Sequence, residues 1–198
     1  MVVTISADLK RIIESLGRLP DPVSHPSLVL IAGLPGSGKS YFSRALAEKA
    51  NLAIVQSDAV RKLLFPQPTY DSNESYRVFL RCYEVMEYLL NLSISVIFDA
   101  TNLRERNRKY PYRIAKATGA RLIIVWIEAP PHVALKRLEA RAANRDPLDK
   151  SDATWEIYQD MAASMQSINR EHYVVNTSKN IGPGLDEIAR EVKGKGSI

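Results

Sequence analysis

The segment Gly-Leu-Pro-Gly-Ser-Gly-Lys-Ser at positions 33–40 is the feature that most constrains how this chain can fold. It matches the pattern G-x-x-x-x-G-K-[ST], in which glycines let successive backbone N–H groups point inward around a phosphate. The apolar run 28–32 before it is typical of a buried strand, and residues 41–50 after it favour a helix. This strand–loop–helix context predicts a phosphate-binding loop rather than an ordinary glycine-rich turn.

We expect this loop to bind the phosphates of ATP. The predicted ATP-binding residues are Gly33, Leu34, Pro35, Gly36, Ser37, Gly38, Lys39, Ser40 and Tyr41. Lys39 is expected to act in catalysis by reaching the β- and γ-phosphates, and the Ser40 hydroxyl to ligate Mg²⁺. ATP is preferred to GTP because the chain contains no Asn-Lys-x-Asp sequence, the motif that reads guanine.

Apolar runs alternate with helical segments along the chain, which predicts a parallel sheet covered by helices on both faces. The predicted strands are residues 28–32, 53–56, 94–99, 122–127 and 173–177. A chain of 198 residues is long enough for one well-buried core and short for two. We therefore expect a helix and linker at 1–27, followed by a single three-layer α/β domain at 28–198.

Bulk properties argue against several classes of protein. No apolar run approaches the length of a membrane span, and residues 1–9 lack the basic and apolar parts of a signal peptide. Cys82 is the only cysteine, which excludes an internal disulfide and a cysteine-cluster zinc site. We expect a cytoplasmic protein with no membrane partner, and the composition leaves its oligomeric state open.

Polar residues that follow the second strand are candidates for the site, because ligands of open α/β sheets bind beyond the carboxyl ends of the strands. Asp58 and Arg61 lie three residues apart at the start of a predicted helix and can share a face. Asp58 could accept the proton of an acceptor hydroxyl while Arg61 binds a phosphate or acidic group. The alternative is that Ser57 or Asp58 only caps the helix.

The third strand is expected to end at Asp99, with Asn102 shortly after it. An acidic residue at this point is typical of a Walker-B carboxylate, which contacts Mg²⁺ directly or through water. Asp99 and Asn102 could instead line the substrate pocket, or serve only as caps. We therefore treat Asp99 as a candidate for both metal and substrate binding, and Asn102 as a candidate for substrate binding.

A basic segment after the fourth strand predicts a lid. Arg137 and Arg141 are four residues apart and lie on one face of a predicted helix at 131–143. A cation that arrives with lid closure would stabilise the charge on a transferring phosphoryl group. We expect the lid at about 131–150, with Arg141 acting in catalysis and Arg137 in substrate binding.

The net charge of +5 is unevenly distributed, with a second basic group between the third and fourth strands. Its members are Arg104, Arg106, Arg108, Lys109, Arg113, Lys116 and Arg121. Such a group suits a phosphate-rich partner, including nucleic acid, but it is equally compatible with a solvated helix face.

The glycine-rich loop, Ser-Asp-x-x-Arg at 57–61, Phe-Asp-Ala-Thr-Asn-Leu at 98–103 and the basic lid helix together resemble the small P-loop kinases of the polynucleotide-kinase-like and zeta-toxin-like group. The resemblance covers about residues 28–166. It implies a P-loop NTPase fold of the nucleotide-kinase type, with a five-stranded parallel sheet in the order 2-3-1-4-5 and a helical lid. It also implies that Asp58 is the base, that Arg61 contacts an acceptor phosphate, and that Arg141 is the lid arginine. In the same way Asp99 and Asn102 match the strand-end motif of these kinases.

The sequence thus predicts an ATP- and Mg²⁺-dependent kinase. Its acceptor would be a hydroxyl-bearing small molecule or the 5′-hydroxyl of a nucleotide or nucleic acid. The alternatives are an ATPase or nucleotide switch without kinase activity, a sugar or other small-molecule kinase, and a non-catalytic nucleic-acid adaptor. Hydrolytic P-loop proteins commonly carry a glutamate beside the Walker-B aspartate, whereas Ala100 follows Asp99 here, which favours transfer to a hydroxyl.

Overall fold

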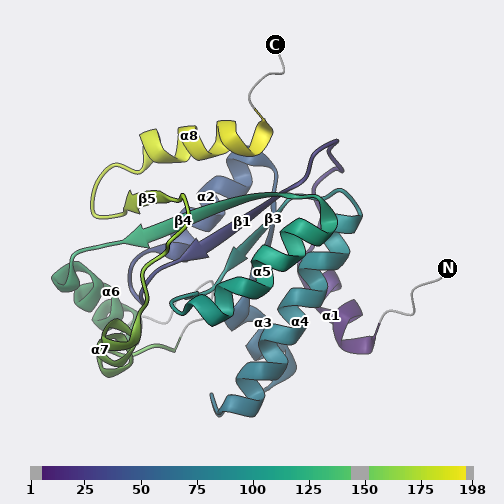
Figure 1. Cartoon of the computed structure of the whole chain (residues 1–198). Helices are drawn as coiled ribbons and strands as arrows, with labels where there is room; N and C mark the ends of the chain where they lie inside the picture. The colour runs from purple at the N-terminus through teal and green to yellow at the C-terminus, as the bar shows by residue number, and fades with distance from the viewer. Residues whose placement is uncertain (1–5, 144–151, 195–198) are drawn as a thin grey trace.

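The computed structural model of the protein describes residues 6–143 and 152–194 (Figure 1). Helices and strands alternate along the chain, as the pattern of apolar runs predicts. In chain order the elements are α1 (Ala7–Ser15), β1 (Ser27–Ala32), α2 (Lys39–Ala50), β2 (Ala53–Gln56), α3 (Ser57–Leu64), α4 (Ser72–Asn91), β3 (Val96–Asp99), α5 (Glu105–Thr118), β4 (Arg121–Glu128), α6 (Pro131–Ala143), α7 (Trp155–Ser164), β5 (Tyr173–Asn176) and α8 (Gly182–Lys193).

The five strands form one parallel sheet in the order β2-β3-β1-β4-β5. This confirms the predicted three-layer α/β fold and its strand order. Because all strands run the same way, their carboxyl ends meet at one edge of the sheet, where the glycine-rich loop and the segments after β2 and β3 also lie. The order of the strands therefore decides which polar side chains become neighbours.

Strand β1 lies at the centre of the sheet and is buried along its whole length. Successive strand residues point to opposite faces, so Leu28 and Leu30 belong to one hydrophobic cluster while Val29 and Ile31 belong to another. The first cluster packs under α1, α4 and α5, and the second under α2 and α8. Figure 1 shows α8 above the sheet and α4 and α5 below it.

Helices α6 and α7 lie beyond the carboxyl ends of the strands and form a third, smaller cluster (Figure 1). Ala134 and Leu138 of α6 and Tyr158 of α7 are buried together, and Leu34 of the glycine-rich loop packs against them. This packing joins the predicted lid region to the loop. Helix α6 covers the first part of the predicted lid at 131–150, and positions 144–150 lie outside the described residues.

Helix α1 packs into the same core as α4, through Leu9 and the fully buried Ile12. Its first turn is capped by Ser6, whose hydroxyl accepts a hydrogen bond from the N–H of Leu9 at 3.3 Å. The segment before β1 thus adds to the hydrophobic core, while the proposed domain division between residues 27 and 28 stays a prediction.

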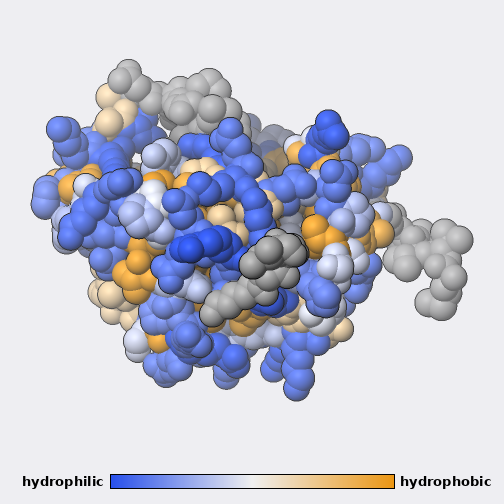
Figure 2. All heavy atoms as spheres, turned by 90° about the horizontal axis from the view of Figure 1, so that it is seen from above, coloured by the Kyte–Doolittle hydropathy of each residue, from blue (hydrophilic) through white to orange (hydrophobic). Residues whose placement is uncertain are grey.

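The face of the molecule that carries α8 is mostly hydrophilic, with hydrophobic residues in small groups (Figure 2). Within the described part of the chain, none of the helices combines the length and the hydropathy needed to cross a membrane.

The packing of α1 predicts the effect of truncating Ile12. Ile12→Ala should lower the free energy of unfolding by about 2–4 kcal/mol, because it removes three buried carbons and leaves a cavity beneath α1. Urea unfolding followed by circular dichroism measures this. Lys10→Ala on the exposed side of the same helix is the control and should change the stability by less than about 0.5 kcal/mol. Equal stability of the two variants would contradict the role of α1 in the core.

Candidate active site

Three strands bring their last residues side by side at the edge of the sheet. In the strand register, Asp99 of β3 pairs with Gln56 of β2 on one side and with Ile31 of β1 on the other. The glycine-rich loop leaves β1 directly after this point, and α3 leaves β2. A carboxylate at the end of β3 is therefore next to both the loop and the start of α3.

The glycine-rich loop needs its glycines for steric reasons. Gly33 has φ +152°, and a Cβ at this position would collide with the backbone oxygen of Ile127 in β4. The N–H of Gly33 donates to the backbone oxygen of Thr101 at 3.0 Å, which ties the loop to the segment after β3. The loop is therefore held closely between its two neighbouring strands.

Helix α2 begins at Lys39 after Gly38, a residue with φ +90° that offers no side-chain cap. The first N–H groups of an α-helix lack partners within the helix and carry a partial positive charge, which favours an anion. Lys39 extends back over the loop and donates from Nζ to the backbone oxygen of Leu34 at 2.9 Å. These groups form the kind of cradle that binds a phosphate.

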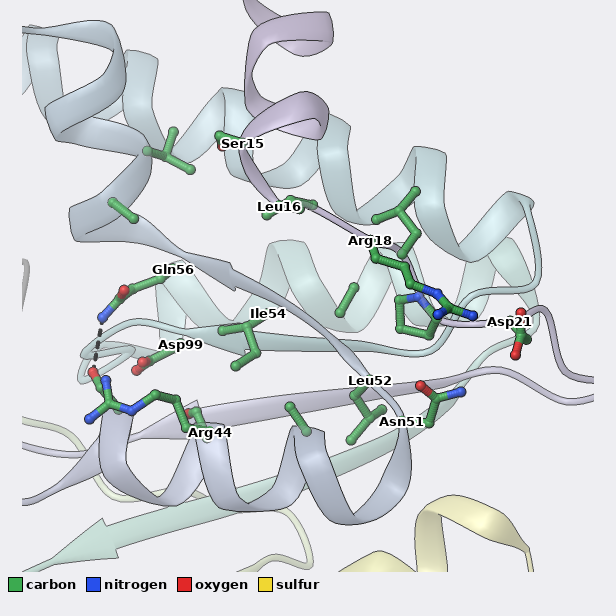
Figure 3. Close-up of a pocket in the computed structure, with 18 residues that line it drawn as sticks. Ser15, Leu16, Arg18, Asp21, Arg44, Asn51, Leu52, Ile54, Gln56 and Asp99 are labelled. Atoms are coloured by element: carbon green, nitrogen blue, oxygen red, sulfur yellow. Dashed lines mark hydrogen bonds between the residues drawn. The ribbon is translucent and has the colours of Figure 1, made fainter. Parts of the chain in front are cut away.

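Asp99 and Ser40 lie together beside Lys39. Gln56 Nε2 donates to Ser40 Oγ at 2.9 Å, as the dashed line in Figure 3 marks. The Asp99 side chain is 3% exposed, and its Oδ2 has no hydrogen-bond partner within residues 6–143 and 152–194. Burial raises the pKa of the Asp99 carboxyl, an effect that the nearby Lys39 ammonium and Ser40 hydroxyl oppose.

The structure brings Asp58 to this edge and gives Arg61 a partner of its own. Asp58 lies in the first turn of α3, close enough to Asp99 to affect its ionisation. Arg61 is buried, forms an ion pair with Glu74 of α4, and its guanidinium lies 4.6 Å from the centre of the Tyr70 ring. The predicted contact between Arg61 and an acceptor phosphate stays a prediction.

Asp152 links the segment before α7 to Tyr70 and to Lys62 of α3. Its Oδ2 accepts a hydrogen bond from the Tyr70 hydroxyl at 2.6 Å, and its Oδ1 one from Lys62 Nζ at 3.0 Å. Partial burial and the bond to Asp152 raise the pKa of the Tyr70 hydroxyl. Tyr70 also has φ +59°, a backbone conformation that is strained for a bulky residue and is often found at functional sites.

Asn102 is fully buried and has φ +46°. Its Nδ2 donates to the backbone oxygen of Ile31 at 2.7 Å, immediately before the glycine-rich loop. The side chain therefore fixes the end of β3 to the end of β1. Its predicted contact with substrate is not tested by this arrangement and stays a prediction.

Arg137 of α6 contacts the loop itself. Its guanidinium donates to the backbone oxygen of Gly36 at 3.2 Å, and to Thr177 Oγ1 at 2.8 Å and the Thr177 backbone oxygen at 2.9 Å. Thr177 Oγ1 in turn donates to the backbone oxygen of Ser37 at 2.6 Å.

Two other predicted site residues lie nearby in the chain. Arg141 follows Arg137 one turn later on α6 and is partly buried, and Tyr41 is mostly exposed on α2.

Thr177 is a residue that the sequence reasoning missed. It directly follows β5, so the rule that ligand-binding residues follow parallel strands would have singled it out. Gln56, the last residue of β2, was missed for the same reason. In both cases the signal was a polar residue at the carboxyl end of a strand.

A pocket of about 670 Å³ opens from this site along the free edge of β2 (Figure 3). Asp99, Gln56 and Arg44 lie at one end, and Ile54 and Leu52 line the middle. Arg18 and Asp21 of the linker after α1 lie at the other end. Its volume is in the range of small-molecule sites, so there is room for a ligand beside the cradle.

The residues at this edge fit a nucleotide phosphate chain with Mg²⁺. The uncapped start of α2 and the Lys39 ammonium suit phosphate oxygens, and the buried Asp99 oxygen without a partner suits a cation. No group of three or more His, Cys, Asp or Glu side chains in the described residues could hold a metal. This donor set is typical of Mg²⁺, which proteins bind through one or two side chains together with substrate phosphates.

The sheet order, the loop and the strand-end carboxylate define a P-loop kinase-like fold. Residues 28–168 match a protein family described as AAA domain. The chain belongs to this family. It is 33% identical over 118 residues to L-seryl-tRNA(Sec) kinase of Methanococcus maripaludis, a match that covers 56% of this chain and 44% of that relative. The chain thus spans less than half the length of this curated relative.

Solved structures show the same fold at low sequence identity. Kti12 of Chaetomium thermophilum, solved with ADP-AlF3, has a TM-score of 0.70 and 16% identity, covering 85% of this chain and 100% of that one. The APS kinase CysC of Mycobacterium tuberculosis, solved with AMPPNP and APS, has a TM-score of 0.63 and 17% identity, covering 85% and 96%. Together with the family match, they bear out the P-loop kinase-like part of the predicted class.

The collision of a Cβ at Gly33 with β4 leads to a prediction about the loop. Gly33→Ala should lower the free energy of unfolding by about 3 kcal/mol or displace the loop, since both backbone strain and a clash must be relieved. Thermal unfolding measures the change. Gly119→Ala is the matched control: Gly119 also has positive φ, but a Cβ there meets nothing within 4 Å, so it should cost only about 1 kcal/mol. Equal losses would show that the clash has no effect.

Proposed function

We propose that the protein is an ATP- and Mg²⁺-dependent phosphotransferase that moves the γ-phosphoryl group of ATP to the hydroxyl of an acceptor. The acceptor would be a hydroxyl-bearing small molecule or the 5′-hydroxyl of a nucleotide or polynucleotide. The observation that carries the proposal is the meeting of Lys39, Ser40 and Asp99 at one edge of the sheet, with Asp58 beside them. Phosphoryl transfer depends mainly on such positioning and charge stabilisation.

The donor side would be held by the loop residues 33–40 and by the two metal candidates. When bound, Mg·ATP supplies the phosphoryl group and a cation that neutralises the developing charge. Backbone N–H groups of the loop and the Lys39 ammonium would hold the phosphate oxygens, and Ser40 and Asp99 would hold the metal. Arg137 secures the loop through Gly36, and Arg141 would add positive charge from the same helix.

The acceptor side would be served by Asp58. Its carboxylate would accept the proton of the acceptor hydroxyl while the hydroxyl oxygen forms a bond to the γ-phosphorus and the bond from that phosphorus to the bridging oxygen of ADP breaks. Arg61 lies against the Tyr70 ring, and Tyr70 is close enough to Asp58 for that carboxylate to affect its ionisation. The pocket along β2 supports the proposal because it provides space next to Asp99.

Two further observations support transfer to a hydroxyl. The relative from Methanococcus maripaludis is named as a kinase, and the match includes 56% of this chain. Asp99 is followed by Ala100 rather than by the glutamate that commonly positions water in hydrolytic P-loop proteins. Kinase activity is therefore the preferred function, ahead of an ATPase or a nucleotide switch.

The proposal predicts that Lys39→Ala abolishes phosphoryl transfer, since it removes the side-chain cation that touches the loop. We expect a loss of at least about 10²-fold in turnover, measured as transfer of label from γ-labelled ATP. Lys49→Ala, which removes an exposed lysine paired with Asp186 at the far end of α2, is the control and should keep full activity. Retained activity in Lys39→Ala would overturn the whole site.

The role of Asp58 can be separated from nucleotide binding. Asp58→Asn should reduce turnover by about 10²–10⁴-fold, because the amide cannot accept the proton, while leaving ATP binding nearly unchanged. Calorimetry measures the binding and label transfer the turnover. Asp186→Asn on α8 serves as the control for a lost exposed carboxylate and should affect neither. Normal turnover of Asp58→Asn on a confirmed acceptor would contradict its role as the base.

A panel of acceptors tests the proposal and its alternatives in one experiment. The protein is incubated with γ-labelled ATP and 5′-hydroxyl oligonucleotides, nucleosides or sugars. Label in an oligonucleotide or nucleoside supports a nucleotide or polynucleotide acceptor, and label in a sugar supports a small-molecule acceptor. Label that appears only as free phosphate, whatever acceptor is present, would replace the kinase proposal with an ATPase.

A further inference from the structure

The structure divides the basic group between β3 and β4 into members with different surroundings. Arg108 is fully buried and donates to backbone oxygens of Asn102, Gln166 and Ser167, and Arg121 pairs with Glu191. The other five are exposed and form no ion pair with any described residue: Arg104, Arg106, Lys109, Arg113 and Lys116. These five are therefore open to a partner from solvent and hold no competing carboxylate from the described residues.

These cations form a continuous track on α5. Positions 106, 109, 113 and 116 recur every three or four residues, so they share one face of the helix and extend over about 15 Å. The only acidic residue of α5, Glu105, is held by Arg108 at 3.0 Å and so does not neutralise this face. The track starts five residues after Asp99 and leads away from the candidate active site, in the layer that Figure 1 shows below the sheet.

Elsewhere in the described residues, some exposed cations pair with carboxylates, whereas others, such as Arg18, Arg190 and Lys193, form no ion pair. Carboxylates pair with Lys10, Lys49, Lys62, Arg81 and Arg121. A concentration of like charges without partners costs free energy, because the charges repel one another. What distinguishes α5 is this concentration, five exposed cations without an ion pair to a described residue, all within residues 104–116.

An exposed aromatic ring lies within the track. Tyr110 is 50% exposed, and its ring stacks on Tyr83 of α4 with centroids 5.1 Å apart and an angle of 12° between the planes. The guanidinium of Arg113 lies 5.9 Å from the Tyr110 ring centre. Tyr83 is itself fixed by an edge contact with Phe98 and a tilted contact with Phe79. Tyr110 thus presents a ring that is supported from behind and open to solvent.

We infer that this α5 surface, made of Arg104, Arg106, Lys109, Tyr110, Arg113 and Lys116, binds single-stranded nucleic acid. A positive track beside a supported aromatic ring is the combination that such ligands require, since phosphates need cations and unpaired bases need a stacking partner. A duplex, whose bases are already stacked on one another, cannot use Tyr110. The inference goes beyond the proposed kinase function, because binding here requires neither ATP nor transfer.

The test measures binding of a 3′-fluorescein-labelled single-stranded oligonucleotide to the full chain by fluorescence anisotropy without ATP, from about 50 to about 200 mM salt. R106E/R113E should weaken binding at least about tenfold and reduce the slope of log K against log salt by one to two, since about 0.7 is lost for each phosphate contact. R190E/K193E on α8, in the opposite layer, makes the same change in net charge and should stay within about twofold of wild type.

Tyr110 provides a second, independent measurement. Tyr110→Ala should weaken binding about tenfold without changing the salt slope, and Tyr110→Phe should restore it, because stacking needs the ring and not the hydroxyl. Because the replaced side chains are exposed, the variants should keep the wild-type fold. Thermal unfolding checks this.

Four outcomes would overturn the inference. These are equal losses in R106E/R113E and R190E/K193E, full binding by Tyr110→Ala, a duplex of the same sequence bound as tightly as the single strand, and binding to phosphatidylserine vesicles without binding to the oligonucleotide. If oligonucleotide binding follows the α5 variants while label transfer fails, the inference stands and the kinase proposal falls.

Discussion

The buried carboxylate of Asp99 is the group on which the arrangement of the site depends. A carboxylate that is removed from water and has an oxygen without a partner in the described residues is unfavourable on its own, and its raised pKa reflects that cost. The strand register fixes the position of this carboxylate, because Asp99 ends β3 between Ile31 of β1 and Gln56 of β2. The Lys39 ammonium and the Ser40 hydroxyl reduce the cost, and a bound cation would remove most of it. The buried Asp99 carboxylate thus lowers the stability of the folded protein in exchange for a site that can bind a cation.

The second requirement is that the glycine-rich loop keeps its shape before any ligand arrives. Several bonds from outside the loop hold it in place. Asn102 donates to the end of β1, and the N–H of Gly33 donates to Thr101. Arg137 donates to Gly36, and Thr177 donates to Ser37. Side-chain ordering costs free energy when it takes place on binding. Because these contacts order the loop during folding, a phosphate would meet a loop whose backbone is already fixed. The α6 helix thereby supports the loop from the side of the predicted lid.

Much of this could be predicted from local patterns in the sequence. The glycine-rich loop and the carboxylate that ends β3 depend on residues close together in the chain and on the rule that parallel strands share their carboxyl edge. The order of the strands follows from the resemblance to P-loop kinases instead. The pairing of Arg61 with Glu74 and of Arg137 with Thr177 joins residues 13 and 40 positions apart. Such contacts depend on how helices pack, and neither charge nor spacing along the chain specifies them. The sorting of the basic group on α5 into buried, paired and exposed members has the same origin.

Two ion pairs near the proposed acceptor side differ in strength, one buried and one partly exposed. The ion pair of Arg61 with Glu74 is buried, and separating it would leave a desolvated charge, a loss of about 3–5 kcal/mol. Lys62 and Asp152 form a pair that is partly exposed, and such pairs contribute about 0–1 kcal/mol. In the proposed kinase, an acceptor beside Asp58 would separate Lys62 from Asp152 at little cost, whereas Arg61 would stay with Glu74 unless the ligand brought a comparable charge. An acceptor phosphate is such a charge, and a neutral sugar is not. The buried pair thus favours anionic acceptors for any contact that Arg61 makes, in agreement with the polyanion for which the α5 surface is suited.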